Sequence, residues 1–211
     1  MADRKPIRRA LVSVYDKDRL LELGAVLSKA GIEIISTGST AKTLQGSGIA
    51  VTEVSEYTGF PEIMGGRVKT LHPKIHSGIL ADQDNPEHLK AIADLDIEPF
   101  DLVVVNLYPF LKTIVSGAEY AECIEQIDIG GPSILRGAAK NHSSVAVISK
   151  VSQYDDLFKA IKAGGSSLKD FVNSHGDPGH FMLQTKVYDR AALPCRICKT
   201  PIKQIVQGQR S

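Results

Sequence analysis

The sequence has few cysteines and no long apolar segment. Only three cysteines occur in its 211 residues, and no secretory signal is recognised, so a reducing, cytoplasmic compartment is expected. The basic N-terminus is followed too soon by charged residues for a signal peptide. No apolar run approaches the about 18 residues that a membrane-spanning helix needs, so no membrane association is expected.

Net charge is also nearly absent. The formal charge of +1 favours neither nucleic acid nor an acidic partner. The charge is nevertheless unevenly distributed, because residues 180–211 carry +5 and the residues before them carry −4. The hydrophobic share of 43% is enough for a true core, and the length suits one domain or one domain with an appendage.

Strand and helix patterns alternate along most of the chain. Strands are predicted at 9–14, 32–37, 50–54, 77–81, 101–108 and 144–149, and helices at 17–31, 38–48, 85–97, 116–127 and 154–165. The run DLVVVNLY is almost entirely apolar, as in a strand buried on both faces of a parallel sheet. Asn85 is predicted to cap the helix that Pro86 opens. This alternation predicts the α/β class, as a parallel α/β sandwich.

Polar residues follow three of the predicted strands. They are Tyr15, Asp16 and Lys17 after the first, Thr37, Gly38, Ser39 and Thr40 after the second, and Asn106 and Tyr108 after DLVVV. Ligands of open parallel sheets bind at the carboxyl ends of the strands. The segment STGST also opens a predicted helix, whose N-terminus favours a phosphate. A capped turn without a ligand remains the alternative for that segment.

Two glycine-rich segments each carry lysine. The first, GGRVKTLHPKIHSGIL, spans residues 65–80, and the second, QIDIGGPSILRGAAKNH, spans residues 126–142. Both are predicted to be loops that converge, with Asn106 and Tyr108, on one anionic ligand that bears an amide. A solvated charge run is the alternative for either segment alone. It fits the pair less well, because the lysines are interleaved with glycine and apolar residues instead of acids.

The motifs together resemble one enzyme family. SVYDK, STGSTAKTL, YTGFPEIMGGRVKTLHPKIHSGIL, VVVNLYPF and QIDIGGPSILRGAAKNH occur in the order and spacing of the IMP cyclohydrolase domain, over about residues 8–155. That domain is the N-terminal half of a bifunctional purine biosynthesis enzyme whose other half is a transformylase. The resemblance implies a three-layer α/β/α sandwich with a mostly parallel sheet, of the methylglyoxal-synthase-like type. It also implies the conversion of formylated aminoimidazole carboxamide ribotide (FAICAR) to IMP with loss of water, without any cofactor.

The resemblance also assigns roles to residues. The catalytic residues that it implies are Lys69, Tyr108, Asp128 and Lys140. The substrate-binding residues that it implies are Tyr15, Asp16, Lys17, Thr37, Gly38, Ser39, Thr40, Arg67, Val68, Thr70, Val105, Asn106 and Ile129. Among these, Asn106 and Tyr108 are expected to hold the base.

The implied reaction needs both a proton acceptor and donors. An amide nitrogen is a poor nucleophile, and the formyl oxygen gains negative charge before it leaves as water. A lysine with an ordinary pKa of about 10.4 accepts protons poorly, so Lys140 needs burial or cationic neighbours to act as a base. Asp128 opposes that shift, and the sequence leaves the identity of the general base open. His72 and His76 are expected to be structural.

The resemblance changes near residue 159. The segments GGSSLKDF, VYDR, PCRIC and TPIK resemble the C-terminal end of formamidopyrimidine-DNA glycosylase, including half of its zinc finger. Cys195 and Cys198 supply only one of the two required cysteine pairs, so no structural zinc is expected within one chain. We therefore predict a cyclohydrolase-like domain at 1–158 and an irregular glycosylase-like tail at 159–211. The helix that begins near residue 154 is predicted to dock loosely.

The predicted chain is thus chimeric or truncated, with neither glycosylase activity nor a transformylase domain expected. A glycosylase of that family begins with a catalytic Pro-Glu, which is absent here. The favoured function is IMP cyclohydrolase, with FAICAR and IMP as ligands and a homodimer as a possible assembly. The alternatives are an inactive purine-nucleotide-binding domain and a DNA-binding accessory that uses the basic tail, although nucleic acid is not the expected partner.

Overall fold

Five parallel strands form one sheet in the computed structural model, in the order β3-β2-β1-β4-β5. The strands are β1 (Arg9–Val14), β2 (Glu33–Ser36), β3 (Thr52–Glu53), β4 (Leu102–Asn106) and β5 (Ala146–Ile148). The structure describes residues 5–162, 194 and 199–201. The stretch 5–162 lies within the first of the two units into which the chain divides, Met1–Leu168 and Lys169–Ser211.

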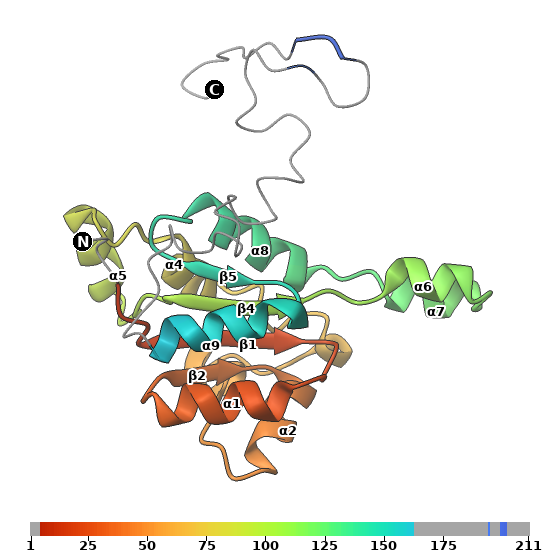
Figure 1. The fold of residues 1–211 in the computed structure, drawn as a ribbon, viewed down its shortest axis with the longest axis horizontal. Coiled ribbons are helices and arrows are strands. Elements are labelled where there is room, and N and C mark those ends of the chain that lie inside the picture. The colour runs from red at the N-terminus through yellow and green to blue at the C-terminus, as the bar shows by residue number, and fades with distance from the viewer. Residues whose placement is uncertain (1–4, 163–193, 195–198, 202–211) are drawn as a thin grey trace. The chain divides into compact units, whose positions relative to one another are not determined.

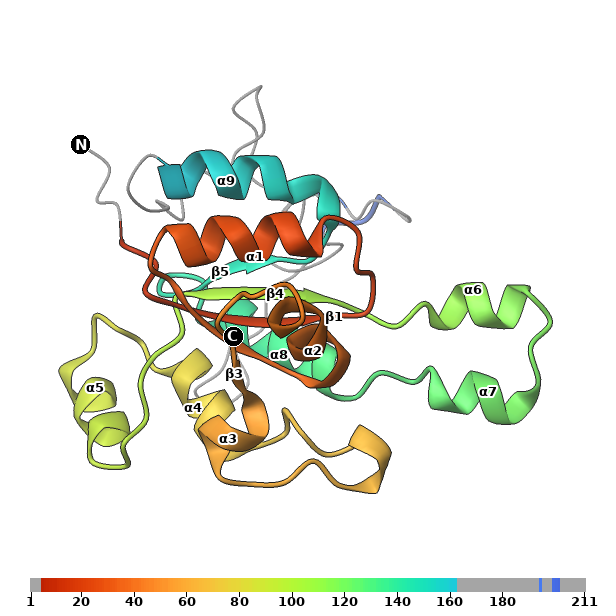
Figure 2. The same ribbon diagram turned by 90° about the horizontal axis from the view of Figure 1, so that it is seen from below.

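Helices cover both faces of this sheet. The α-helices of the described residues are α1 (Leu20–Lys29), α2 (Gly38–Gln45), α3 (Val54–Thr58), α4 (Pro73–Leu80), α5 (Pro86–Ala93), α6 (Phe110–Val115), α7 (Tyr120–Glu125), α8 (Gly130–Lys140) and α9 (Tyr154–Lys162), of which α6 and α7 stand away from the sheet. Figure 2 shows α1 and α9 on one face of the sheet and α4 and α8 on the other. The two covered faces explain why β1 and β4 are apolar nearly throughout. The predicted three-layer α/β/α sandwich with a parallel sheet is confirmed.

One predicted strand is wrong. Residues 77–81 were expected to be a strand, but most of this segment belongs to α4. The helix begins where the His72 ring accepts a hydrogen bond from the backbone N–H of Lys74, at 3.1 Å from Nδ1 to N. Ile75 and Ile79, four residues apart, are both fully buried. The apolar spacing is therefore helical, and a short apolar run such as SGILA does not separate the two alternatives.

The second glycine-rich segment also differs from the prediction, because it is largely helix α8 instead of a loop. Ile134 and Ala138 are buried on the side of α8 that packs against β4 and α4. The Asn141 amide ends this helix and donates hydrogen bonds to the carbonyl oxygens of Ile79 and Ala81, each at 2.8 Å. The two glycine-rich segments are thus joined near their C-terminal ends, and residues of their N-terminal parts are free to line the candidate site.

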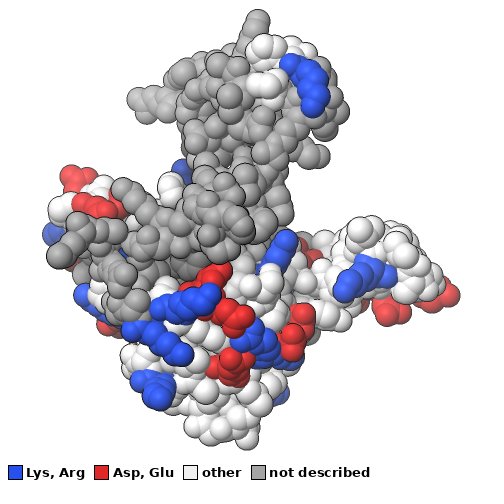
Figure 3. Space-filling view, in the orientation of Figure 1, with Lys and Arg blue, Asp and Glu red and all other residues white. Residues whose placement is uncertain are grey.

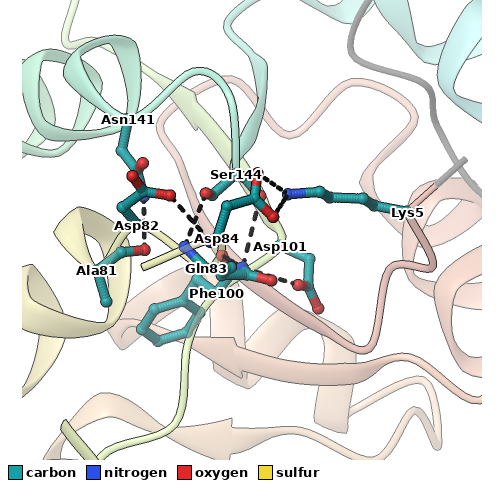
Figure 4. A network of polar contacts seen from close by, with 9 residues as sticks. All are labelled: Lys5, Ala81, Asp82, Gln83, Asp84, Phe100, Asp101, Asn141 and Ser144. Carbon is teal, nitrogen blue, oxygen red and sulfur yellow. Dashed lines mark hydrogen bonds and ion pairs between the residues drawn. The ribbon is translucent and has the colours of Figure 1, made fainter. Parts of the chain in front are cut away.

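A polar network fixes the opposite edge of the sheet, at the amino ends of the strands (Figure 4). The Gln83 side chain donates to a carboxylate oxygen of Asp101 at 3.1 Å, and its backbone N–H donates to the Ser144 hydroxyl at 3.0 Å. The other Asp101 oxygen accepts from the backbone N–H of Arg8 at 2.7 Å. The network therefore ties the segment after α4 to the starts of β1, β4 and β5, away from the strands' carboxyl ends.

Helix α9 is present as predicted, but it is not loosely docked. Tyr154, Leu157 and Phe158 are only 1%, 0% and 7% exposed. The predicted domain boundary at residue 158 falls inside this helix, and most of the predicted glycosylase-like segment lies outside the described residues. No helix among the described residues is long and apolar enough to cross a membrane.

Candidate active site

A cavity lies at the carboxyl ends of the strands, beside β1 and β4. These two strands are neighbours, and their last residues, Val14 and Asn106, are paired in the register. The chain continues from β1 toward β2 on one side and from β4 toward β5 on the other, so the connections diverge at this point. Ligands of open α/β sheets bind at such a switch point. The cavity volume of about 490 Å³ is in the range of small-molecule sites.

Most predicted site residues line this cavity. They are Tyr15, Lys17, Thr37, Ser39, Thr40, Arg67, Lys69, Thr70, Val105, Asn106, Tyr108, Asp128 and Ile129. Asp16, Val68 and Lys140 do not line it, and Gly38 lines a smaller adjoining recess with Glu62 and Lys69. The structure adds lining residues that were not named individually as predicted site residues, some of them from the two glycine-rich segments. They are Ser13, Val14, Gly65, Gly66, Ile124, Glu125, Ile127, Gly130 and Gly131.

One end of the cavity is suited to an anion. The Lys17 ammonium donates to the Val14 carbonyl and, at 2.9 Å, to the Thr40 hydroxyl. Burial of the ammonium, and next the charge of Lys69, lower the pKa of Lys17, while Asp16 acts in the opposite direction. The start of α2 lies at the same end and points free backbone N–H groups outward. Two cations beside a helix N-terminus favour a phosphate group.

The Lys69 side chain lies between two glycines. A Cβ atom on Gly66 would be 3.2 Å from the Lys69 nitrogen, and a Cβ on Gly38 would be 3.5 Å from it. Gly66 also has a φ of 87°, a backbone conformation that favours glycine. The nearest carboxylate is Glu62, with an N–O distance of 3.5 Å. Gly38 and Gly66, the residue just before the RVKT motif, therefore make room for the ammonium group.

Asn106 has a structural task in addition to the predicted one. Its side-chain oxygen accepts hydrogen bonds from the backbone N–H groups of Tyr15 at 2.7 Å and Asp16 at 2.9 Å. Its amide donates to the Asp16 carbonyl at 3.3 Å. Asn106 thus holds the loop after β1 in place while it lines the cavity, and its predicted contact with a base stays a prediction. The rings of Tyr15 and Tyr108, with centroids 5.3 Å apart, form the aromatic wall of the cavity.

Asp128 and Lys140, predicted as an acid/base pair, lie at opposite ends of α8. One Asp128 oxygen accepts from the backbone N–H of Gly131 at 2.7 Å, and the other accepts from that of Tyr108 at 3.4 Å. Lys140 is the exposed last residue of α8, about 15 Å along the helix axis from Gly130. Within one chain, the structure therefore brings Asp128 into the cavity and leaves Lys140 outside it.

Helices α6 and α7 form an arm that extends from the body of the domain (Figures 1 and 2). Neither helix contains a buried residue, and Figure 3 shows much of the arm's surface to be uncharged. Ile124 and Glu125 of α7 reach the cavity. Glu125 forms an ion pair with Arg67 of the RVKT motif, and both side chains are exposed. This ion pair joins the arm to the opposite wall of the cavity.

The two histidines of the first glycine-rich segment do not line the cavity. His72 caps α4, in agreement with the structural role expected for it. His76 is partly buried, its ring lies 3.5 Å from the Ser133 hydroxyl, and burial lowers its pKa. Among the described residues, no cluster of three or more potential metal ligands occurs. Cys195 and Cys198 lie outside the described residues.

Comparison with known proteins assigns the chain that forms this cavity to a family. Residues 19–133 match the family model described as MGS-like domain. The chain belongs to the MGS-like domain family. The MGS-like match contains Lys69 and Asp128 and begins at Arg19, so it leaves out Tyr15 and Lys17.

Curated relatives of this MGS-like chain carry the name bifunctional purine biosynthesis protein PurH. The protein from Mycobacterium marinum is 60% identical over 79% of this chain and 32% of its own length. The protein from Cutibacterium acnes is 56% identical over 81% of this chain and 33% of its own length. The chain thus spans about a third of the length of these relatives. A solved structure titled crystal structure of ForH is 33% identical, with a TM-score of 0.65, over 77% of this chain and 84% of that chain.

Proposed function

We propose that this chain acts in purine biosynthesis by closing the purine ring, converting FAICAR to IMP and water. The similarity to PurH over about four-fifths of the chain supports the pathway. The observation that carries the specific step is the composition of one cavity. It combines a cationic end for a ribose phosphate, an aromatic wall for a planar base, and ionisable groups from Lys69 and Asp128.

The reaction needs no atoms beyond those of FAICAR. The carboxamide nitrogen forms a bond to the formyl carbon, the nitrogen loses a proton, and the formyl oxygen gains one. The resulting hydroxyl group then leaves with a second nitrogen-bound proton as water, and a carbon–nitrogen double bond forms. The enzyme must therefore accept a proton from nitrogen and deliver protons to oxygen.

Three side chains of the cavity are suited to these tasks. Lys69 is a charged donor for the formyl oxygen as negative charge develops there. Asp128 is fixed by two backbone N–H groups and keeps free lone pairs with which to accept a proton. Tyr108 offers a hydroxyl group from the aromatic wall that it forms with Tyr15. In this arrangement the proton transfers belong to Lys69 and Asp128, without Lys140 of the same chain.

We also infer that the arm is the contact surface of a homodimer. Its large apolar side chains are exposed, with Leu111 at 73%, Val115 at 79% and Tyr120 at 80%. Exposed apolar side chains gathered on one projection mark an interaction surface. A second copy presents the same apolar surface, so two arms are self-complementary.

The test of the proposed reaction is to incubate the purified chain with FAICAR and to follow the appearance of IMP by chromatography. The Asp128→Asn variant keeps the shape of the side chain and removes its basic oxygen, so it should lose most of the turnover. IMP binding without turnover in the unaltered chain would instead indicate an inactive nucleotide-binding domain. An Asp128→Asn variant as fast as the unaltered chain would remove Asp128 from the mechanism.

A further inference from the structure

The loop between β1 and α1, residues 15–19, presents Tyr15 and Lys17 to the cavity. The Asn106 side chain holds this loop from β4, through the backbone N–H groups of Tyr15 and Asp16. Asp16 also accepts a hydrogen bond from the backbone N–H of Asp18 at 3.0 Å. These bonds fix the start of the loop, and they leave its end, where the chain turns into α1, to be fixed by other contacts.

Arg19 stands at that end, and its backbone is unusual. It has φ 55° and ψ 17°, a left-handed conformation that residues other than glycine adopt at an energetic cost. Its guanidinium group donates to Glu22 at 2.7 Å and to Asp155 of α9 at 2.7 Å. The same group lies over the ring of Phe158, 5.6 Å from the ring centre. The strained residue is therefore held against α9 by an ion pair and a cation–π contact.

Tyr154 of α9 is buried and is influenced by the charges of the same loop. It is 1% exposed, and its hydroxyl oxygen has no hydrogen-bond partner in the structure. Burial raises the pKa of Tyr154 to about 12, and the negative charges of Asp16 and Asp18 add to the rise. The contact that joins the loop to α9 is therefore the one that Arg19 makes with Asp155 and Phe158. Figures 1 and 2 both show α9 lying alongside α1, on the same face of the sheet.

We propose that α9 positions the loop at residues 15–19, with Arg19 as the positioning residue that sets Tyr15 and Lys17 toward the ligand. The inference rests on the proposed nucleotide site. It gives α9 a task beyond covering the sheet, since Asp155 is largely exposed and adds nothing to the core. The helix lies outside the MGS-like match at residues 19–133, so this task goes beyond the shared segment.

Two neighbouring aspartates of α9 give a matched pair for the test. Asp155 contacts Arg19, whereas Asp156 pairs only with Lys159 of its own helix among the contacts that the structure shows. Both side chains are similarly exposed, at 65% and 62%. In the 211-residue chain, Asp155→Ala should weaken IMP binding about three- to fivefold, which corresponds to the loss of one exposed ion pair. Asp156→Ala should bind IMP as the unaltered chain does, and Asp155→Glu should restore most of the affinity.

The Arg19→Gly variant separates positioning from general stability. Glycine adopts the left-handed conformation without cost, so the melting temperature should stay near that of the unaltered chain. The contacts to Asp155 and Phe158 are lost together, so IMP affinity should fall about tenfold. A melting temperature that falls while the folded protein binds IMP normally would overturn the positioning role.

Hydrogen exchange of the Tyr15 and Asp16 amides provides a measurement that needs no ligand. Both amides donate to Asn106, and they should exchange faster in Asp155→Ala than in Asp156→Ala. Equal exchange and equal IMP affinity in the two variants would overturn the inference while leaving the cyclohydrolase proposal intact. Failure of the unaltered chain to bind IMP would count against the nucleotide site, and the amide exchange would still decide the role of α9.

Discussion

Replacing Gly130 with alanine has two opposite effects on stability, a gain in helix propensity and a steric clash. Gly130 is the first residue of α8, where alanine favours the helix by up to about 1 kcal/mol. The added methyl carbon would lie 2.3 Å from the Thr70 hydroxyl oxygen, whereas ordinary contact begins at 3.4 Å. Thr70 is 4% exposed and lines the cavity, so it must move by about 1 Å in a packed environment.

The steric effect should exceed the helical one. Overpacking costs about 1–3 kcal/mol, which outweighs a helix propensity that acts only at a terminal position. We expect Gly130→Ala to lower the free energy of unfolding by about 1–2 kcal/mol and the melting temperature by about 2–8 °C. Displacement of Thr70 should also weaken IMP binding about tenfold, since the ligand meets an altered wall.

Gly137 of the same helix is the matched control. A methyl group there would lie 3.4 Å from the nearest side-chain carbon, on Ile79, at the limit of ordinary contact. Gly137→Ala should therefore be neutral or stabilising by up to about 1 kcal/mol, with unchanged IMP affinity. Thermal unfolding followed by circular dichroism, together with IMP titration, gives both quantities. A Gly130→Ala variant that melts at or above the temperature of the unaltered chain and binds IMP normally would refute this reasoning.

Four further predictions concern the cavity and the arm. Lys69→Ala should lower kcat at least about 100-fold, because a charged donor to a developing oxyanion contributes about 3 kcal/mol; a loss under tenfold contradicts the assignment. Glu125→Gln should bind IMP about two- to fivefold more tightly, because Arg67 is released from its ion pair, while Glu122→Gln on the same helix should change nothing. Weaker IMP binding by Glu125→Gln would argue against a competition between Glu125 and the ligand for Arg67. Burial lowers the pKa of Lys17 from 10.5, so its share of IMP affinity should be lost as the pH rises through that lowered pKa, and Lys17→Met should lack this step. Leu111→Glu should turn a dimer into a monomer in light scattering, and an unaltered chain that is already monomeric would exclude the homodimer.

The sequence predicted the strands of the sheet correctly where the apolar runs were long. The run that became β4 is buried on both faces, and its composition alone distinguishes it from a surface strand. The prediction of a strand at 77–81 was wrong because the helical spacing is visible only from Ile75 and Ile79 together. Ile75 lies outside the five residues of the predicted strand. Short apolar runs need their flanking residues before the period can be assigned.

Most of the candidate site also followed from the sequence, since residues just after parallel strands share one edge of the sheet. The separation of Asp128 from Lys140 did not follow, because the second glycine-rich segment was interpreted as a loop. A loop can bring its two ends together, whereas a helix of 11 residues holds them apart. The hydrogen bonds of Asn106 to the loop after β1 could not be predicted either, since they depend on where the backbone of Tyr15 passes.

The most direct test of the account follows the oxygen atom that leaves. FAICAR labelled with ¹⁸O in the formyl group is incubated with the 211-residue chain, and IMP is analysed by mass spectrometry over time. Ring closure by this chain predicts unlabelled IMP that appears far faster than in buffer, with the label released as water. IMP that retains the label, or a rate equal to that in buffer, would contradict the proposed reaction.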